Sequence, residues 1–272
     1  MENSIWHIQL GDNPLIAAAL HDGHELRPEI AQILALSEEV RRREEDPYTS
    51  RWTSVADTRI VALLSRFEVD FNRPREKAIY LCPEDAWGLQ VWKEPPSEQI
   101  IKHALAEYDS FYSEIYRLFT DFERRLGRFV VFDLHSYNHR RGGPDGPVAD
   151  PKLNPDVNVG TGSMDRNRWA PVVDRFMSDL RLFDFPGRHL DVRENVKFKG
   201  GCFPQWTHTN FPETACVIAI EFKKFFMDEW TGRLFPVVHE AIEKALRSTV
   251  PGIREILEEM GERHHELSDS VR

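Results

Sequence analysis

The sequence has few cysteines, no excess of basic residues and no long apolar run, and each of these shortages excludes a class of protein. Three cysteines without CxxC spacing form neither a disulfide framework nor a thiolate metal cage. A formal net charge of -10 argues against a phosphate-backbone partner, so we expect no nucleic-acid binding. The longest apolar runs, such as 15–20, are too short to cross a bilayer, and the N-terminus has no signal-peptide pattern. We therefore expect a cytoplasmic protein without a membrane partner.

Glycine-rich phosphate loops and nucleophile elbows are also missing. The stretch 140–162 is rich in Gly, Pro, Asp and Asn and has no hydrophobic period, which predicts a long and functional loop. Its glycine pairs, Gly142-Gly143 and Gly160-Thr161-Gly162, lack the pattern of a phosphate loop, and neither Ser136 nor Ser163 stands in a nucleophile-elbow context. Nucleotide binding and serine-hydrolase chemistry are therefore disfavoured.

What the sequence does contain is an alternation of short apolar runs with helical patterns. With 272 residues the chain is short enough for a single domain, 1–272. Apolar runs predict strands, and spacing of apolar residues at three and four positions predicts helices. The expected strands are 14–20, 61–69, 128–134 and 215–220, and the expected helices are 27–45, 97–126, 169–183, 236–246 and 251–263. Such alternation predicts an α/β sheet.

Histidines follow two of the predicted strands directly. His21 ends the first run and His135 ends the third, and ligands of open α/β sheets bind beyond the carboxyl ends of the strands. His21, His24 and Glu25 lie in one tight turn, and imidazole together with carboxylate is the ligand set of catalytic zinc. A single histidine is more often a hydrogen-bonded structural residue, and a polar cluster after a strand also suits other chemistries. The pattern alone therefore fits a metal site and a polar cluster without a metal about equally well.

Arginines cluster near the end of the second predicted strand. Arg66 and Arg73 carry planar guanidinium groups that match a carboxylate, and Asn72 stands beside Arg73. If this segment is a strand, Arg66, Glu68, Asp70 and Asn72 share one face. The alternative is a surface ion-pair network among Arg66, Glu68, Asp70, Arg73 and Glu76.

Glu221 directly follows the apolar run 215–220. A carboxylate at the end of a buried strand is desolvated, which raises its pKa toward the range of a general acid or base. The alternative is an ion pair with Lys223 or Lys224. Glu221 is thus a candidate catalytic residue.

Five short motifs occur in a fixed order along most of the chain. They are His21-x-Gly23, Ser65-Arg66 with Asp70-x-Asn72-Arg73, Asp133-x-His135-Ser136, Asn195 to Gly201 with its Phe198-Lys-Gly-Gly core, and Ile220-Glu221 running on to Met227-Asp-Glu229. Each is short, but five in this order are hard to obtain by chance. Together they resemble the N-formylglutamate amidohydrolase family, distant relatives of aspartoacylase and the zinc carboxypeptidases.

The resemblance implies both a fold and a metal. The fold would be a three-layer α/β/α sandwich with a mixed central sheet, carboxypeptidase-like and thus phosphorylase/hydrolase-like, with Zn²⁺ at the strand ends. By this resemblance His21, Glu25 and His135 bind the metal. The relatives place a glutamate three residues after the first histidine, where this sequence has His24, so His24 is the alternative to Glu25. Glu25 is favoured because a carboxylate matches the chemistry of the relatives.

The resemblance also implies roles in catalysis. Glu221 would be the catalytic base and then acid, Arg66 would polarise the acyl carbonyl, and Asn72 and Arg73 would bind the substrate carboxylate. The implied reaction is zinc-dependent hydrolysis of a small N-acyl amino acid, foremost N-formyl-L-glutamate to formate and glutamate, as in histidine degradation. One alternative is a zinc carboxypeptidase or a deacylase of another acidic amide. Another is a non-catalytic metal- or carboxylate-binding protein, against which the buried position expected for Glu221 argues.

Overall fold

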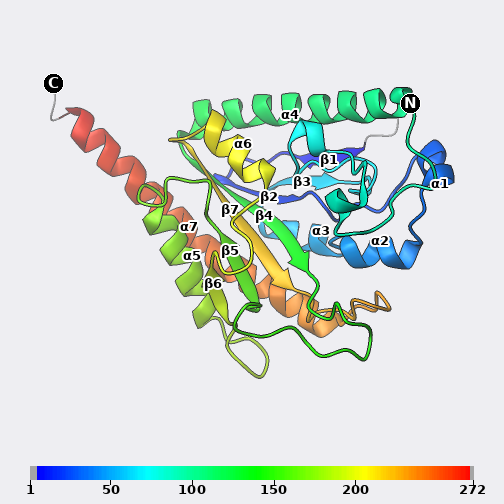
Figure 1. Cartoon of the computed structure of the whole chain (residues 1–272). Coiled ribbons are helices and arrows are strands. Elements are labelled where there is room, and N and C mark those ends of the chain that lie inside the picture. The colour runs from blue at the N-terminus through cyan, green and yellow to red at the C-terminus, as the bar shows by residue number, and fades with distance from the viewer. Residues whose placement is uncertain (1–4, 270–272) are drawn as a thin grey trace.

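A mixed seven-stranded sheet forms the middle layer of the molecule (Figure 1). The computed structural model describes residues 5–269, with side-chain exposure for residues 5–262. The strand order is β1-β3-β2-β4-β7-β5-β6; β1 and β5 run antiparallel to β3 and β7, and the other neighbours are parallel. The strands are β1 (Trp6–Gln9), β2 (Leu15–Ala19), β3 (Thr58–Ala62), β4 (Phe129–Tyr137), β5 (Val157–Gly160), β6 (Val192–Glu194) and β7 (Ala215–Lys223).

Helices cover both faces of this sheet, which confirms the predicted three-layer α/β/α sandwich. Helices α4 and α6 lie on one face and α5 and α7 on the other (Figure 1). None of the helices in the described part of the chain combines the length and apolar character that a transmembrane span requires. The helices are α1 (Pro28–Ile33), α2 (Glu38–Glu44), α3 (Thr49–Trp52), α4 (Glu98–Leu126), α5 (Ala170–Leu182), α6 (Cys202–Asn210) and α7 (Pro236–Asp269), with short 3₁₀ helices η1 (Thr53–Val55), η2 (Arg75–Lys77) and η3 (Pro83–Ala86).

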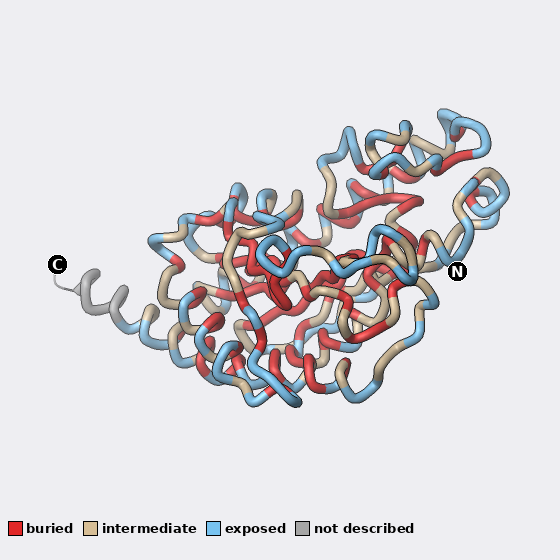
Figure 2. Tube along the Cα trace, turned by 60° about the horizontal axis from the view of Figure 1, so that its bottom comes forward, coloured by how far each residue is buried: buried red, intermediate tan, exposed pale blue. Residues whose placement is uncertain are grey.

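The central strand β4 separates two hydrophobic cores. Its side chains alternate, so Phe129 contacts the rings of Phe119 and Phe122 on α4, whereas Phe132 contacts Phe176 on α5. Every residue of β4 is buried, in agreement with the buried segments that run through the middle of the molecule in Figure 2. Apolar burial stabilises a fold by roughly 25 cal/mol per Å². The two cores therefore fix β4, and with it any side chain at its carboxyl end.

Helix α4 agrees closely with its prediction. The hydroxyl of Ser97 accepts a hydrogen bond from the N–H of Ile100, which caps the first turn. Gly127 follows the last turn with a φ of 74°, a left-handed backbone that glycine adopts without steric cost. Local signals at both ends were therefore sufficient to predict this helix.

The predicted strand 61–69 is wrong beyond Ala62. The chain leaves the sheet there, and Leu64 forms only an isolated parallel bridge with Glu25. The N–H of Glu68 then bonds to the carbonyl of Ser65, which closes a turn. Apolar residues of this turn, such as Phe67, are buried in the hydrophobic core that α4 shares, without belonging to the sheet. A continuous apolar run does not distinguish a strand from a buried turn.

Because of tertiary packing, some helices also differ from the predicted ones. The helix expected at 27–45 is two helices, α1 and α2, because Leu34 is extended, bridges to Trp92 and is buried in the core, after which Ser37 caps α2. The helices expected at 236–246 and 251–263 are one helix, α7, which continues through Pro251. The predicted loop 140–162 contains the short strand β5 near its end.

The strand order creates a crevice at the carboxyl ends of β2 and β4. From β2 the chain proceeds to β3 on one side, whereas β4 lies on the other side of β2. Connections that leave in opposite directions open a gap at the carboxyl edge of the sheet, where ligands of open α/β folds bind. His21 follows β2 at this edge.

Candidate functional site

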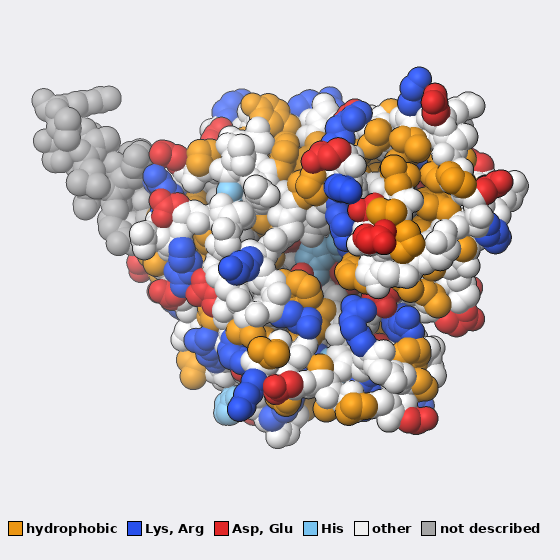
Figure 3. Space-filling model, in the orientation of Figure 1, with side chains coloured by type: hydrophobic (Ala, Val, Ile, Leu, Met, Phe, Trp, Pro, Cys, Tyr) orange, Lys and Arg blue, Asp and Glu red, His pale blue; other side chains and the backbone are white. Residues whose placement is uncertain are grey.

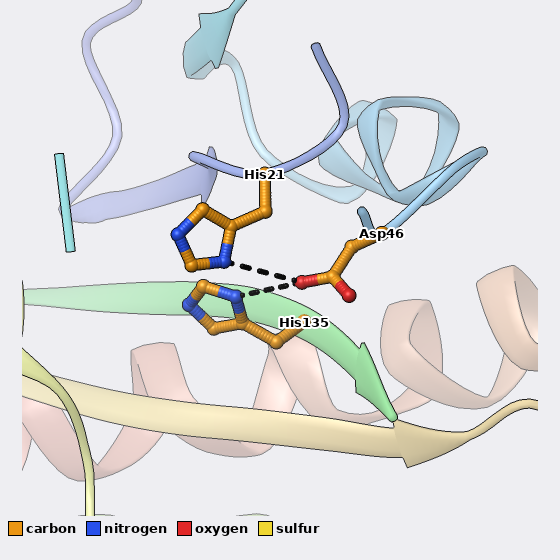
Figure 4. Close-up of side chains that lie close together, drawn as sticks. All are labelled: His21, Asp46 and His135. Carbon is orange, nitrogen blue, oxygen red and sulfur yellow. Dashed lines mark hydrogen bonds and ion pairs between the residues drawn. The ribbon is translucent and has the colours of Figure 1, made fainter. Parts of the chain in front are cut away.

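Two histidines and an aspartate converge in this crevice. The rings of His21, after β2, and His135, in β4, have centroids 4.8 Å apart. Asp46 comes from the loop that follows α2, and its Oδ2 lies 3.4 Å from Nδ1 of His21 and 3.0 Å from Nδ1 of His135 (Figure 4). All three residues are buried, and each offers one ligand atom within 4.8 Å of the others. Among the described residues, this group has the composition of a metal site.

Glu25 and His24, the expected third ligand and its alternative, lie outside this group, in which Asp46 occupies the third position. Glu25 is exposed, and its backbone pairs with the chain at Leu64. The imidazole of His24 is instead hydrogen-bonded to the carboxylate of Glu45. The backbone of this turn is held against the segment after β3, so the first motif contributes His21 alone.

A second carboxylate lies behind each imidazole. Nε2 of His21 is 2.7 Å from Oδ1 of Asp70, and Nε2 of His135 is 2.9 Å from Oδ1 of Asp133. Carboxylates in this position fix the tautomer and orientation of metal-binding histidines. With Nε2 donating to this carboxylate, Nδ1 of each ring is directed toward Oδ2 of Asp46: a protonated Nδ1 donates to that oxygen, and a deprotonated Nδ1 can bind a metal.

The electrostatic balance of the group favours a bound cation. Burial opposes protonation of His135, yet the carboxylates of Asp133 and Asp46 hold its pKa well above its usual value. Burial would raise the pKa of Asp46, but the two histidines hold it well below its usual range. Oδ2 of Asp133 is buried and has no hydrogen-bond partner among the described residues. Two imidazoles and a carboxylate are a ligand set that suits zinc with an open position, so these residues fit a divalent metal.

Glu221 lies beside the group on the neighbouring strand. It is paired in register with His135, because β7 runs parallel to β4. Its side chain lines the same cavity of about 400 Å³ as His21, Asp46 and His135. Burial, reinforced by the charges of Asp46 and Asp133 and opposed by His135, raises the pKa of Glu221 to about 8. This carboxylate is therefore placed to exchange a proton with a molecule in the cavity.

Cationic side chains surround the cavity, in agreement with the hollow in Figure 3, where a histidine is visible at the bottom and Lys and Arg side chains lie around the rim. Arg66 is engaged with Asp70, 2.8 Å from its Oδ2, and with the hydroxyl of Tyr80. Within the described residues Arg73 has no ion pair and no hydrogen bond from its guanidinium. That group lies 4.9 Å from the ring centre of Tyr80 and 5.9 Å from that of Trp87. Arg73 is therefore available to an anionic ligand.

Asn72, which precedes Arg73 in the sequence, contacts His135. Its side-chain nitrogen is 3.2 Å from Nε2 of His135, and its oxygen accepts the N–H of Phe203 at 2.9 Å. Gly201 faces this amide, because a Cβ at that position would lie 2.3 Å from its oxygen. The Phe198 to Gly201 segment thus forms one wall of the cavity, and Phe198 in this wall is exposed.

Asp46 is the residue that sequence reasoning missed. It follows Glu44 and Glu45, and this acidic stretch resembles the solvated end of a helix. Pro47 was the usable signal, because it ends the helical pattern and so places Asp46 in a loop. His21, His135, Arg66, Arg73 and Glu221 were all identified, and the structure brings them to one cavity.

Comparisons with known proteins agree with this architecture. The chain is similar to the crystal structure of N-formylglutamate amidohydrolase from Ralstonia eutropha JMP134, with a TM-score of 0.73 and 15% identity over 93% of this chain and 98% of that one. It is also similar to a gene product of Agrobacterium tumefaciens, with a TM-score of 0.62 and 17% identity over 91% of this chain and 96% of that one. At these identities the likeness concerns the fold.

No curated protein matches the sequence. The model of the N-formylglutamate amidohydrolase family matches residues 13–227, a span that includes the two histidines, Asp46, the arginines and Glu221. This match covers most of the chain. The protein therefore belongs to the N-formylglutamate amidohydrolase family.

Proposed function

We propose that this chain, 1–272, is a zinc-dependent amidohydrolase domain that cleaves N-formyl-L-glutamate to formate and glutamate. The observation that carries the proposal is the convergence of His21, Asp46 and His135 beside Glu221 in one cationic cavity. His21 and His135 would hold the metal through Nδ1 and Asp46 through its carboxylate. When bound, a zinc ion supplies a Lewis acid that lowers the pKa of water to about 7.

Arg73 carries substrate recognition in this proposal. An N-acyl amino acid presents a carboxylate near the scissile amide, and a guanidinium without another partner can bind it through two parallel hydrogen bonds. The rings of Tyr80 and Trp87 hold the guanidinium in place without using its donors. The amide of Asn72 lies next in sequence and lines the same wall, so it would contact the same carboxylate.

Glu221 and Arg66 act in the chemical step. In its ionised form, Glu221 accepts a proton from the attacking water and returns it to the amine nitrogen of the leaving glutamate. Arg66 keeps N–H donors beyond those that contact Asp70 and Tyr80, and these stabilise the negative charge that develops on the acyl oxygen. Because Asp70 and Tyr80 fix the guanidinium, little reorganisation is needed during the reaction.

The proposal is tested by metal content and formate release. Purified protein, loaded with zinc and desalted, is analysed for bound metal and assayed with N-formyl-L-glutamate before and after chelation. We expect about one zinc per chain and release of formate that stops on chelation and returns with zinc. Release that persists in metal-free protein would exclude the metal mechanism. Bound zinc without any release from this substrate would refute the substrate.

Glu221→Gln separates catalysis from metal binding. Its turnover should fall by roughly 10²–10⁴-fold, the usual contribution of a general acid or base, while bound zinc stays at the wild-type level. Asp179→Asn is a matched control, since Asp179 lies on α5 and pairs with Arg175 away from the cavity. Loss of zinc from Glu221→Gln would assign Glu221 to the metal instead.

A further inference from the structure

Asp46 differs from the two histidines because it neither lies in a strand nor follows one closely. It lies in the loop after α2, and the hydrogen bond from its N–H to the carbonyl of His21, at 2.8 Å, links it directly to the first histidine. A metal ligand must be held within about 0.5 Å of its binding position. Some other part of the chain must therefore fix this loop.

We propose that Lys224 and Glu45 are positioning residues that hold Asp46 in place for the metal. The inference rests on the proposed metal site and goes beyond it, because neither residue belongs to the ligand set. Lys224 and Glu45 are each 1% exposed. Burying an unpaired charged group is energetically costly, so both side chains require polar partners. These partners indicate which part of the chain each residue positions.

Lys224 ties the Asp46 loop to the central strands. Its ammonium donates to the carbonyl of Arg43 at 2.6 Å and to that of Glu45 at 2.7 Å, on either side of the end of α2. A cation at this end of a helix also interacts favourably with the helix dipole. The backbone N–H of Lys224 donates to the carbonyl of Tyr137 at 3.0 Å, two residues beyond His135. One residue therefore connects β4, β7 and the loop.

Glu45 fixes the same loop from the other side. Its carboxylate accepts hydrogen bonds from the hydroxyl of Ser65 and from the guanidinium of Arg41, the latter at 3.2 Å, and lies against the imidazole of His24. Arg41 also donates to the carbonyl of His24 at 3.0 Å. His24, a candidate metal ligand in the sequence, thus contacts Glu45, the residue next to Asp46, instead.

These contacts place Asp46 between two anchored neighbours. Its Oδ1 accepts the hydroxyl of Ser136 at 3.1 Å, which leaves Oδ2 directed toward the two Nδ1 atoms. Loss of the lysine would free the carbonyls of Arg43 and Glu45, and the loop would move with them. Removing groups that orient metal ligands typically weakens metal affinity about 10–100-fold.

The experiment measures zinc affinity by competition with a chelator, together with the melting temperature of the metal-free protein. Lys224→Met and Glu45→Gln should each weaken zinc binding by about 10–100-fold. Lys223→Met is the matched control, because the neighbouring lysine pairs with Asp156 at 3.0 Å and contacts neither Asp46 nor its loop. We expect its zinc affinity to equal that of the wild type.

A double-mutant cycle separates positioning from general structural support. If Lys224 acts through Asp46, Lys224→Met should cause no further loss of zinc affinity in an Asp46→Asn background. Additive losses in the cycle, or wild-type affinity in both Lys224→Met and Glu45→Gln, would overturn the inference. If Lys224→Met does not fold, Glu45→Gln in the same cycle decides. A wild-type protein that binds no zinc, or Asp46→Asn with undiminished affinity, would refute the metal site itself.

Discussion

Lowering the pH from 7 to 5 should destabilise the protein through one buried histidine, His208. This residue lies in α6 and is 7% exposed. Its Nε2 accepts the N–H of Val217 at 3.0 Å, and its Nδ1 lies 2.8 Å from the hydroxyl of Ser163. Burial lowers the pKa of His208 from 6.5 to about 4. The folded protein therefore keeps this imidazole neutral at a pH where the unfolded chain protonates it.

The size of the effect follows from the two pKa values. The unfolded chain binds the proton as the pH falls through 6.5, and the folded protein binds it only near 4. The unfolded state thus holds more protons in this window, so stability is complete above pH 6.5 and is lost as the pH falls toward 4. Between pH 7 and pH 5 the contribution of His208 amounts to a loss of about 2 kcal/mol.

Urea unfolding of the metal-free protein at pH 7 and pH 5 measures this loss. His208→Gln provides the reference, because its amide oxygen can accept the N–H of Val217 and does not titrate. The free energy of unfolding of the wild type should fall by about 2 kcal/mol more than that of His208→Gln over this range. His7→Gln, which removes an exposed imidazole, should follow the wild type. Equal losses in the wild type and His208→Gln would refute the reasoning.

Three further predictions concern the cavity. Arg73→Ala should lower kcat/KM for N-formyl-L-glutamate by about 10–100-fold, and an unchanged value would exclude Arg73 from substrate binding. Trp87→Ala removes the ring that both Arg66 and Arg73 face, at 5.0 and 5.9 Å, so KM should rise and kcat should fall; unchanged values of both would contradict this role. Gly201→Ala should displace the Asn72 amide and lower activity, whereas Gly142→Ala, where a Cβ meets nothing within 4 Å, should not.

The metal group could be inferred in part because two of its members follow apolar runs. A buried parallel strand has a continuous apolar sequence. In an α/β fold, the carboxyl end of such a strand lies at the edge of the sheet where ligands bind. His21 and His135 were identified on this basis, and the structure places them in one crevice. Glu221 was identified by the same argument, and its register with His135 confirms that the two strands are neighbours.

Asp46, the third member of the group, could not be predicted from local sequence patterns, because its position depends on tertiary packing. Asp46 reaches the histidines because α1 and α2 are separate helices, and the chain breaks between them where Leu34 enters the core. A sequence window over 27–45 shows helical spacing throughout, since the break is caused by contacts with Trp92, which is distant in sequence. His24 and Glu25 were the nearer candidates in sequence, but the bridge between Glu25 and Leu64 fixes their backbone elsewhere.

The sequence by itself determined the elements whose signals are local: the buried strands β2, β4 and β7, the capped helix α4, and the polar residues that follow the strands. Apolar runs, cap residues and glycine stops act over a few positions, so they can be read without knowledge of the rest of the chain. Only the tertiary structure decided which polar residues meet. Ligand sets such as His21, Asp46 and His135 form through strand order, helix breaks and buried ion pairs, and these depend on contacts between residues far apart in sequence.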